Sequence, residues 1–423
     1  MTMASERALA IFPAGVSNGE FGLPDEHVVV MSRGGGCRLW DSDGKEYLDF
    51  SMGWGSVLVG HARPEVVAAV RAQAGDGSNF AYLNSEALGL AEEIARISPA
   101  AERLRFCASG TEATMYCQRL ARAFTGRPQI LKFEGAYHGA NEAGVTSLFP
   151  NRLPDFPEPE LTSAGTPDAK HSLLVAPFND LEKTQALLAE YAASLAGVIV
   201  EPLQRCTPPV AGFLEGLRAA CSEHDVLLIY DEVVTGFRLA PGGGQGYFEV
   251  TPDLATYGKV VGGSGPLSCV AGRAEIVDLA DPARKGEPDF VYFNGTLHGN
   301  PVAAAATLAT LDELARPQTH DRLNAYADDF CREAQKVLAA NRVGAIACNT
   351  GSLWQILFMA APPRNQADML AGDGEAMRRL DTELLKRGQY NIPGVRRFFS
   401  LAHGEREMEE TLKALDESCR ALA

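Results

Sequence analysis

Cysteine occurs in this 423-residue chain without any pattern that would pair it. The nine cysteines are odd in number and scattered, and no Cys-x-x-Cys pair occurs among them. This distribution indicates neither a disulfide framework nor a zinc site, so no metal is expected. A reducing compartment fits it best. The first ten residues also lack the apolar core of a signal peptide.

A basic block and a long apolar run are missing as well. The net charge of −16 argues against nucleic acid or an anionic membrane surface as a partner. No uninterrupted apolar run approaches the length of a membrane span. We therefore expect a cytoplasmic protein that binds neither nucleic acid nor membrane.

The composition is otherwise that of an ordinary globular protein, with 46% apolar and 22% charged residues. Its length allows a large core and more than one lobe. In the middle of the chain, short apolar runs alternate with helical patterns, which is typical of an α/β sheet with crossover helices. The runs that predict strands are Leu104–Ala108, Gln129–Phe133, Gly197–Glu201, Val226–Asp231 and Ser268–Gly272.

The two ends of the chain show a different pattern. Cys37–Asp49 reads as a hairpin with Asp43-Gly44 as its turn, and Val302–Leu314 and Glu405–Leu422 read as helices. We expect a large domain over residues 61–300 with a mostly parallel central sheet and flanking helices. A smaller α+β domain would combine residues 1–60 and 301–423. The proline-rich stretch Pro150–Pro167 is long enough to be an active-site loop.

Lys259 and Asp231 are the first candidates for chemistry. Lys259 lies between an apolar run and a glycine loop, and Asp231 ends the apolar run that begins at Val226. A lysine amine attacks an aldehyde only when its neutral form is accessible. An aspartate at the carboxyl end of a buried strand can keep a pyridine nitrogen charged. The two residues together are the groups needed to hold pyridoxal phosphate (PLP), although a lone lysine is usually a solvated surface residue.

Ser109-Gly110-Thr111 follows a predicted strand and opens a predicted helix. The hydroxyls, the unpaired backbone donors and the positive end of the helix dipole suit a phosphate. The alternative interpretation is an ordinary capped helix start. Because Ser109-Gly110-Thr111 lies upstream of Asp231 and Lys259, we favour a phosphate-binding role.

Three further candidates follow predicted strands. Tyr137, between glycines, can lie flat on a cofactor ring or be a buried tyrosine in a turn. His138 can orient the ring or nearby carboxylates, or be structural. Glu201 ends a strand at the edge of the sheet where ligands gather, and a structural role such as pairing with Arg238 is equally compatible.

At these residues the chain resembles a known family. It is similar to the class III aminotransferases of fold type I, and within them to glutamate-1-semialdehyde 2,1-aminomutase and its aminotransferase relatives. The resemblance covers nearly the whole chain. It is carried by the stretches 60–64, 105–113, 132–139 and 231–238, by Lys259 with its glycines, and by 295–301.

The resemblance implies a role for each matching position. Lys259 would be joined to the cofactor aldehyde as a Schiff base and would later move a proton, and Asp231 would pair with the pyridine nitrogen. Val233 and Tyr137 would cover the two ring faces. Thr296 would reach the phosphate of the neighbouring subunit's cofactor, which implies a homodimer with shared active sites. Gly110 and Thr111 would hold the phosphate. Trp54 would line the substrate side, although its position is equally compatible with a buried structural tryptophan.

The departures from the family pattern concern the substrate. The segment from Gly15 to Phe21 carries no arginine, where the aminomutase pattern has one to bind a carboxylate. A late segment that should carry an acid contains Arg396 and Arg397 instead. This change suggests a carboxylate bound from another side, unless the two arginines are solvated surface charges. It favours an altered substrate, such as a β-amino acid.

We expect a PLP-dependent aminotransferase that moves an amino group from an amino acid or amine to a keto acid or aldehyde by a ping-pong mechanism. Glutamate-1-semialdehyde 2,1-aminomutase is the alternative, and an amino acid racemase is a weaker one. A nicotinamide-dependent dehydrogenase is disfavoured because the glycines of 242–246 do not follow a strand and open a helix as that fold requires.

Overall fold

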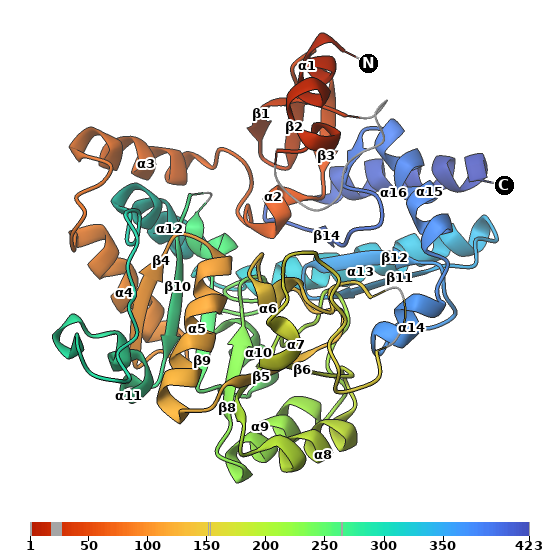
Figure 1. Cartoon of the computed structure of the whole chain (residues 1–423). Helices are drawn as coiled ribbons and strands as arrows, with labels where there is room; N and C mark the ends of the chain where they lie inside the picture. Colours follow the sequence, from red (N-terminus) through yellow and green to blue (C-terminus); the bar gives the residue numbers. More distant parts are fainter. Residues whose placement is uncertain (1, 18–27, 151, 153, 264, 423) are drawn as a thin grey trace. The chain divides into compact units, whose positions relative to one another are not determined.

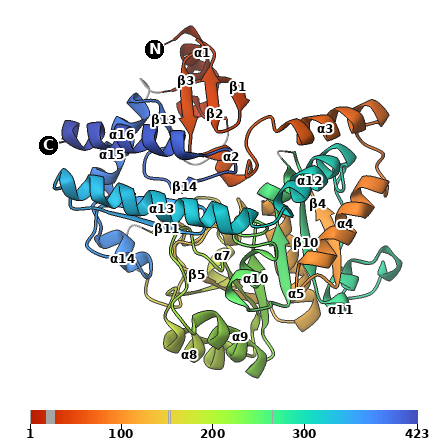
Figure 2. The same ribbon diagram turned by 180° about the vertical axis from the view of Figure 1, so that it is seen from behind.

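The computed structural model describes residues 2–17, 28–150, 152, 154–263 and 265–422. The chain divides into two compact units (Figure 1). The larger unit comprises Glu65–His320 and Pro363–Ala371, and the smaller unit comprises Met1–Pro64, Asp321–Pro362 and Gly372–Ala423. The expected boundaries at 60/61 and 300/301 differ from these. The later boundary moves because helix α12 (Pro301–Leu314) packs on α4 (Ser85–Ile97) and belongs to the larger unit (Figure 2).

A seven-stranded sheet forms the centre of the larger unit, in the order β4-β10-β9-β8-β7-β5-β6. Only β10 runs antiparallel to its neighbours, so the sheet is mostly parallel, as the sequence predicted. The expected strands correspond to five of these seven, and β6 and β9 were not predicted. The strand bounds are β4 Arg103–Cys107, β5 Gln129–Phe133, β6 Leu173–Ala176, β7 Leu195–Val200, β8 Leu227–Asp231, β9 Leu254–Tyr257 and β10 Ser268–Gly272.

The central strands are buried on both faces, because successive side chains point to opposite sides of a sheet. On one face, Ile199 and Ile229 join a cluster with residues of α5 (Gly110–Thr125). On the other face, their neighbours Val198 and Leu228 join a cluster with α8 (Leu181–Tyr191) and α9 (Phe213–Glu223). Helices α8 and α9 lie side by side (Figure 1). This double coverage explains why the strands read as continuous apolar runs.

Helix α5 positions the candidate phosphate site. Ser109 caps its start in an extended conformation, and Gly126 ends it with a φ of 68°, a left-handed conformation that suits glycine. The other helices of the larger unit are α3 Pro64–Asp76, α6 Glu142–Val145, α7 Ala169–Ser172, α10 Gly243–Phe248, α11 Ala274–Val277 and α14 Gln366–Ala371, and the 3-10 helices are η3 Lys259–Gly262, η4 Asp278–Ala280 and η5 Pro282–Arg284.

The smaller unit contains two sheets, with orders β1-β2-β3-β13 and β11-β12-β14. The expected hairpin is β2 and β3, and Gly44 takes a φ of 86° in its turn. The strand bounds are β1 Met31–Gly35, β2 Arg38–Asp41, β3 Glu46–Asp49, β11 Ile346–Thr350, β12 Leu353–Leu357, β13 Gln389–Tyr390 and β14 Arg397–Phe398. Its helices are α1 Met3–Ile11, the 3-10 helix η1 Pro13–Gly15, α2 Met52–Gly55, α13 Thr319–Ala340, α15 Gly374–Lys386 and α16 Glu405–Leu422.

A short segment, Pro363–Ala371, belongs to the larger unit although its neighbours in sequence do not. Asn179 holds it by donating from Nδ2 to the carbonyl of Arg364 at 2.7 Å. The backbone N–H of Gln366 bonds to the buried carboxyl of Glu134, whose pKa burial raises to about 8.

Two sequence expectations concern stretches without regular structure. In Pro150–Pro167, the described residues form neither helix nor strand. In the segment from Gly15 to Phe21, where no arginine occurs, residues 18–21 lie outside the described part of the chain. Over the described ranges, no helix is both long enough and apolar enough to cross a membrane.

Candidate cofactor site

The predicted cofactor residues follow the carboxyl ends of strands that run in the same direction. Tyr137 and His138 follow β5, Glu201 follows β7, Asp231 ends β8 and Lys259 follows β9. These four strands are parallel, so their carboxyl ends meet at one edge of the sheet. β4 is antiparallel to β10, which is antiparallel to β9, so β4 ends at the same edge and delivers Ser109 there.

Asp231 is held by three donors inside the protein. Its Oδ2 lies 2.8 Å from Nδ1 of His138, and its Oδ1 accepts the Thr256 hydroxyl and the N–H of Val233, both at 3.1 Å. Only 6% of Asp231 is exposed. Burial alone would raise the pKa of its carboxyl, but the hydrogen bond and charge of His138, the Val233 N–H and the charge of Lys259 outweigh burial and lower the pKa. Asp231 is therefore an anion at neutral pH.

Lys259 opens the 3-10 helix η3 directly after β9. Its φ is 51°, in the left-handed region that a residue with a Cβ adopts rarely. Strain of this kind occurs at functional sites, where the surrounding structure holds it. Lys259 is half-buried, and its charge reaches Asp231.

Val233 lies between the helix start and the lysine loop. A Cβ added to Gly110 would meet the Val233 methyl groups at 3.0 Å, and one added to Gly258 would meet them at 3.3 Å. Val233, whose own N–H bonds to Asp231, is thus packed between the start of α5 and the residue before Lys259. The segments that carry three expected anchor points of a cofactor come together here.

The start of α5 is tied to the loop that follows β5. Ser109 Oγ accepts the N–H of Glu112 at 3.2 Å, and Thr111 Oγ1 accepts the N–H of Ala140 at 3.1 Å. A Cβ at Gly139 would come within 2.6 Å of the Thr111 Cα, so only glycine allows this approach. The first N–H groups of any α-helix have no partner within it, and together with the helix dipole they form an anion site.

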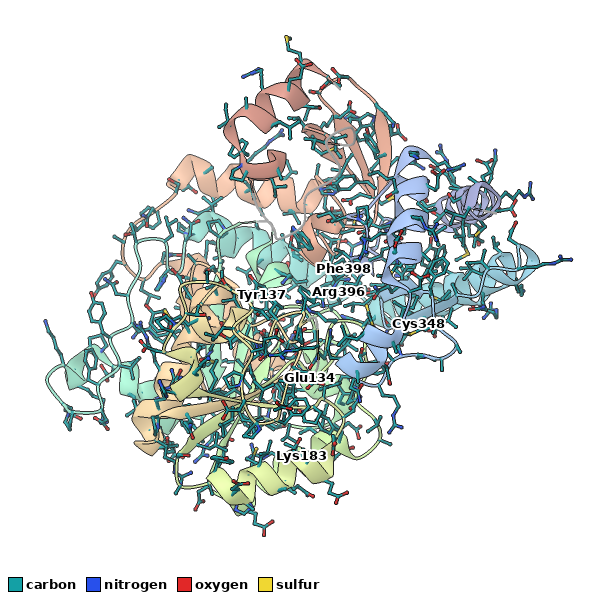
Figure 3. All side chains as sticks on the ribbon, turned by 45° about the vertical axis from the view of Figure 1, so that its right-hand side comes forward. Glu134, Tyr137, Lys183, Cys348, Arg396 and Phe398 are labelled. Atoms are coloured by element: carbon teal, nitrogen blue, oxygen red, sulfur yellow. The ribbon has the colours of Figure 1, made fainter. Side chains whose placement is uncertain are left out.

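Glu201 organises the backbone at the same edge. Its Oε1 accepts the N–H of Tyr137 at 3.0 Å, and its Oε2 accepts the N–H of Arg205 at 3.3 Å. Both oxygens therefore hold loop residues in place, which supports a structural role. Tyr137 is half-buried and carries its ring at this loop (Figure 3).

Sequence reasoning missed three residues of this region. Thr256 holds Asp231, and Arg205 lies over the Tyr137 ring with its guanidinium carbon 5.6 Å from the ring centroid. Lys132 is fully buried in β5 and donates to four carbonyls between Ala136 and Thr146. A lysine inside an otherwise apolar strand was a visible signal. Nothing in the sequence pattern marked Thr256 or Arg205.

The remaining candidates lie elsewhere. Thr296 is exposed in the larger unit and lines a hollow of ≈ 770 Å³ with Tyr82, Leu83 and Leu88. Its loop approaches α5, since His298 Nε2 is 3.4 Å from Glu112 Oε2.

The candidate substrate residues belong to the smaller unit. Trp54 has a φ of 58° and lines a hollow of ≈ 640 Å³ with Asp49, His61 and Tyr390. Arg397 is only 2% exposed and pairs with Asp381, so its charge is already matched and it is not a solvated surface residue. Arg396 lies over the Phe398 ring at 5.7 Å and is the better candidate of the two (Figure 3).

The residues of the larger unit fit PLP. The buried anion Asp231 suits the protonated nitrogen of a pyridine ring, and the start of α5 suits a phosphate. Nε2 of His138 is buried without a hydrogen-bond partner among the described residues, as expected for a site built around a further group. Gly110 and Gly258 pack on Val233 so closely that a Cβ at either position would press on its methyl groups.

Comparison with known proteins agrees with this geometry. Residues 23–374 match the family described as Aminotransferase class-III. An omega-transaminase from Sphaerobacter thermophilus is 32% identical, with a TM-score of 0.91 over 99% of this chain and 96% of that one. A beta-phenylalanine aminotransferase from Variovorax paradoxus is 30% identical, with a TM-score of 0.86 over 97% and 91%.

A glutamate-1-semialdehyde aminomutase from Pseudomonas aeruginosa PAO1 is 25% identical, with a TM-score of 0.87 over 99% of this chain and 94% of that one. Other similar structures were solved with PLP bound or in complex with PMP. The fold expected from the sequence is confirmed. The chain belongs to the class-III aminotransferases, enzymes of fold type I that use PLP.

Proposed function

We propose that Lys259 and Asp231 are the catalytic residues of an aminotransferase whose donor is an amino acid. The observation that carries this proposal is the buried Asp231 carboxylate, kept ionised by His138, Val233 and the charge of Lys259. A carboxylate that stays ionised inside a protein stabilises a positive charge beside it. A protonated ring nitrogen next to Asp231 would be stabilised in this way.

The proposed roles follow from the position of each group. Bound PLP supplies a ring that withdraws electrons and an aldehyde carbon that takes up nitrogen. Asp231 keeps the proton on the ring nitrogen, and Lys259 Nζ takes the proton from the donor carbon and returns it. Tyr137 and Val233 cover the two ring faces. Ser109, Gly110 and Thr111 hold the phosphate, His138 orients Asp231, and Glu201 positions the Tyr137 loop.

The substrate class is supported by the similar proteins. They include a beta-phenylalanine aminotransferase and an omega-transaminase. We infer a donor with a carboxylate, such as a β-amino acid, and a keto acid or aldehyde acceptor. Arg396 and Trp54 are proposed as substrate-binding residues.

The direct test of the function is a donor screen without an acceptor. Amines and amino acids are added singly to holoenzyme, and the cofactor absorbance is followed. An aminotransferase converts its cofactor stoichiometrically to the pyridoxamine form with a true donor. Borohydride reduction of the holoenzyme, followed by peptide mass analysis, should find the label on Lys259. A colourless protein that ignores added PLP would contradict the proposal.

The alternative, an aminomutase, is supported by the similar glutamate-1-semialdehyde aminomutase. The same preparation separates the two functions. Turnover of glutamate 1-semialdehyde without a second substrate would favour the aminomutase. Failure of that reaction, together with donor-dependent cofactor conversion, would favour the aminotransferase. Chiral analysis of recovered donor would expose a racemase.

We also propose a homodimer with shared sites. Around the exposed Thr296, the larger unit exposes apolar side chains: Tyr82 is 86% exposed, Leu83 70% and Leu88 47%. Apolar groups gathered on one surface indicate a partner. A second copy of the chain would cover them and bring Thr296 to the phosphate of the partner's cofactor.

Mixed dimers test whether the sites are shared. Lys259→Ala lacks the lysine, and Thr296→Asp places a negative charge beside the phosphate, so neither homodimer should be active. In a mixed dimer, the Thr296→Asp subunit keeps its own lysine and receives Thr296 from the other subunit. Activity should therefore return on mixing. An inactive mixture of proven heterodimers would contradict shared sites.

We also propose a cytoplasmic enzyme, because the described part of the chain contains no disulfide bond.

A further inference from the structure

Arg205 is a cation beside the proposed cofactor site to which the mechanism above gives no role. It lies in the loop after β7, and Glu201 fixes its backbone by accepting its N–H at 3.3 Å. The other oxygen of Glu201 accepts the N–H of Tyr137 at 3.0 Å. One carboxylate therefore places Arg205 next to the tyrosine that is proposed to cover the ring.

The Arg205 guanidinium is held between two aromatic side chains. Its carbon lies 5.6 Å from the centroid of the Tyr137 ring and 4.5 Å from that of Phe149. Aromatic faces attract a guanidinium and orient it without occupying its N–H donors. Phe149 lies at the start of the irregular region that precedes α7, so the group bridges two loops at the ligand edge of the sheet.

The backbone of Arg205 is in an unfavourable conformation for an arginine. Its φ is 61°, in the left-handed region, where glycine would incur no steric cost. A residue with a side chain held in this conformation, at the edge where ligands bind, points to a function for that side chain.

The charge of Arg205 also affects the groups around it. It contributes to the lowered pKa of the buried Lys132 ammonium, after the larger effect of burial. The donor of an aminotransferase carries an ammonium group of its own. A guanidinium nearby disfavours a plain amine and favours a donor that brings a negative charge.

We propose that Arg205 binds the carboxylate of the amino acid donor and of the keto acid acceptor, and selects against amines that lack a carboxylate. This inference rests on the proposed aminotransferase function and assigns part of its specificity to the larger unit. Arginine presents planar paired donors that match a carboxylate, which a neutral side chain of similar length does not.

A matched pair of donors provides the test. The first pair is β-phenylalanine and 1-phenylethylamine, which is the same molecule without its carboxylate. For any better donor found in the screen, its decarboxylated counterpart is used. Each is measured in the amino half-reaction of wild-type, Arg205→Gln and Arg205→Lys holoenzyme. Arg119→Gln is the control, because Arg119 is an exposed arginine over another tyrosine, Tyr116, at 5.8 Å.

Arg205→Gln should raise the KM of the carboxylate donor roughly 10- to 100-fold, the effect of losing a charged hydrogen bond. The KM of the amine should stay the same or fall, Arg205→Lys should recover part of the loss, and Arg119→Gln should resemble wild type. A second readout needs no turnover: calorimetry should show the affinity of holoenzyme for 3-phenylpropanoate falling by a similar factor in Arg205→Gln.

Equal changes for the acid and the amine would show that Arg205 only packs on the aromatic rings. Unchanged kinetics and unchanged 3-phenylpropanoate affinity would also overturn the assignment, as would a wild-type enzyme that converts its cofactor only with amines lacking a carboxylate. These outcomes differ from failure of the proposed function, in which no donor converts the wild-type cofactor at all.

Discussion

Lys132 is fully buried in β5, and replacing it with methionine tests whether it holds the loop that carries Tyr137 and His138. Its Nζ donates to the carbonyls of Thr146 at 2.6 Å, Ala136 at 3.0 Å, Ala143 at 3.2 Å and Gly144 at 3.4 Å. Ala136 precedes α6, Ala143 and Gly144 lie within it, and Thr146 follows it. Lys132→Met keeps the length of the side chain and removes the donors.

The expected cost follows from those bonds. A buried carbonyl left without its donor costs about 1–3 kcal/mol. The two shortest bonds, to Thr146 and Ala136, therefore contribute roughly 2–6 kcal/mol, and release of a buried amine offsets part of this. We expect a net loss of roughly 2–4 kcal/mol in the stability of the loop.

Hydrogen exchange of the backbone amides in residues 136–146 is the assay, because it reports local opening. A loss of about 2 kcal/mol makes opening roughly 30-fold more frequent. PLP content should fall in parallel. The control is Lys183→Met, because Lys183 is exposed on α8 (Figure 3). Exchange rates in Lys132→Met equal to those of the control would refute the reasoning.

The pH dependence provides a second check on Lys132. Burial lowers the pKa of its ammonium from 10.5 to about 7. Between these values the unfolded chain binds a proton that the folded chain does not, so stability rises with pH. In urea denaturation, the free energy of unfolding of wild type should increase relative to that of Lys132→Met by up to about 1.4 kcal/mol per pH unit above pH 7. Below pH 7 both states hold the proton, and the difference should be constant. A falling difference above pH 7 would contradict the assignment.

Three further predictions concern other groups. Asp231→Asn removes the anion beside the ring nitrogen and should lower kcat/KM by roughly 10²- to 10³-fold in steady-state assays at equal PLP content, a loss that full activity would contradict. Arg205→Gly and Arg205→Ala both lose the contacts with Tyr137 and Phe149, but only glycine relieves the φ of 61°, so Arg205→Gly should be the more stable of the two by about 1 kcal/mol in urea denaturation, and equal stabilities would argue against strain. Arg397→Met leaves Asp381 buried without its cation and should cost about 3–5 kcal/mol, measured by hydrogen exchange in α15, and Asp381→Asn in the same chain should restore part of the loss.

The sequence predicted the sheet well because its strands are covered on both faces. Such strands read as continuous apolar runs, and β5 and β10 were predicted with the bounds they have. β6 and β9 are short, four residues each, and the apolar run before Lys259 was not predicted as a strand. The place of α12 depends on its packing against α4, a contact between distant residues that periodicity does not report.

Residues of the candidate site could be predicted where a polar or charged side chain stands at the end of an apolar strand. Asp231 follows that rule, and the structure brings the charge of Lys259 to it. Thr256 and Arg205 act through contacts with residues far away in sequence, Asp231 and Tyr137. No local pattern encodes such contacts. The difference between Arg396 and Arg397 was hidden for the same reason, since the pairing with Asp381 forms only in the folded chain.

The short segment Pro363–Ala371 limits how this protein can be divided. A fragment made of residues 65–320 would contain the whole central sheet but would lack the Gln366 N–H that bonds to Glu134 and the Arg364 carbonyl that accepts from Asn179. Such a fragment would expose surface next to the strand that leads to Tyr137. Engineering of the cofactor-binding half as an independent module therefore requires a graft of this piece, for example through a circularly permuted gene.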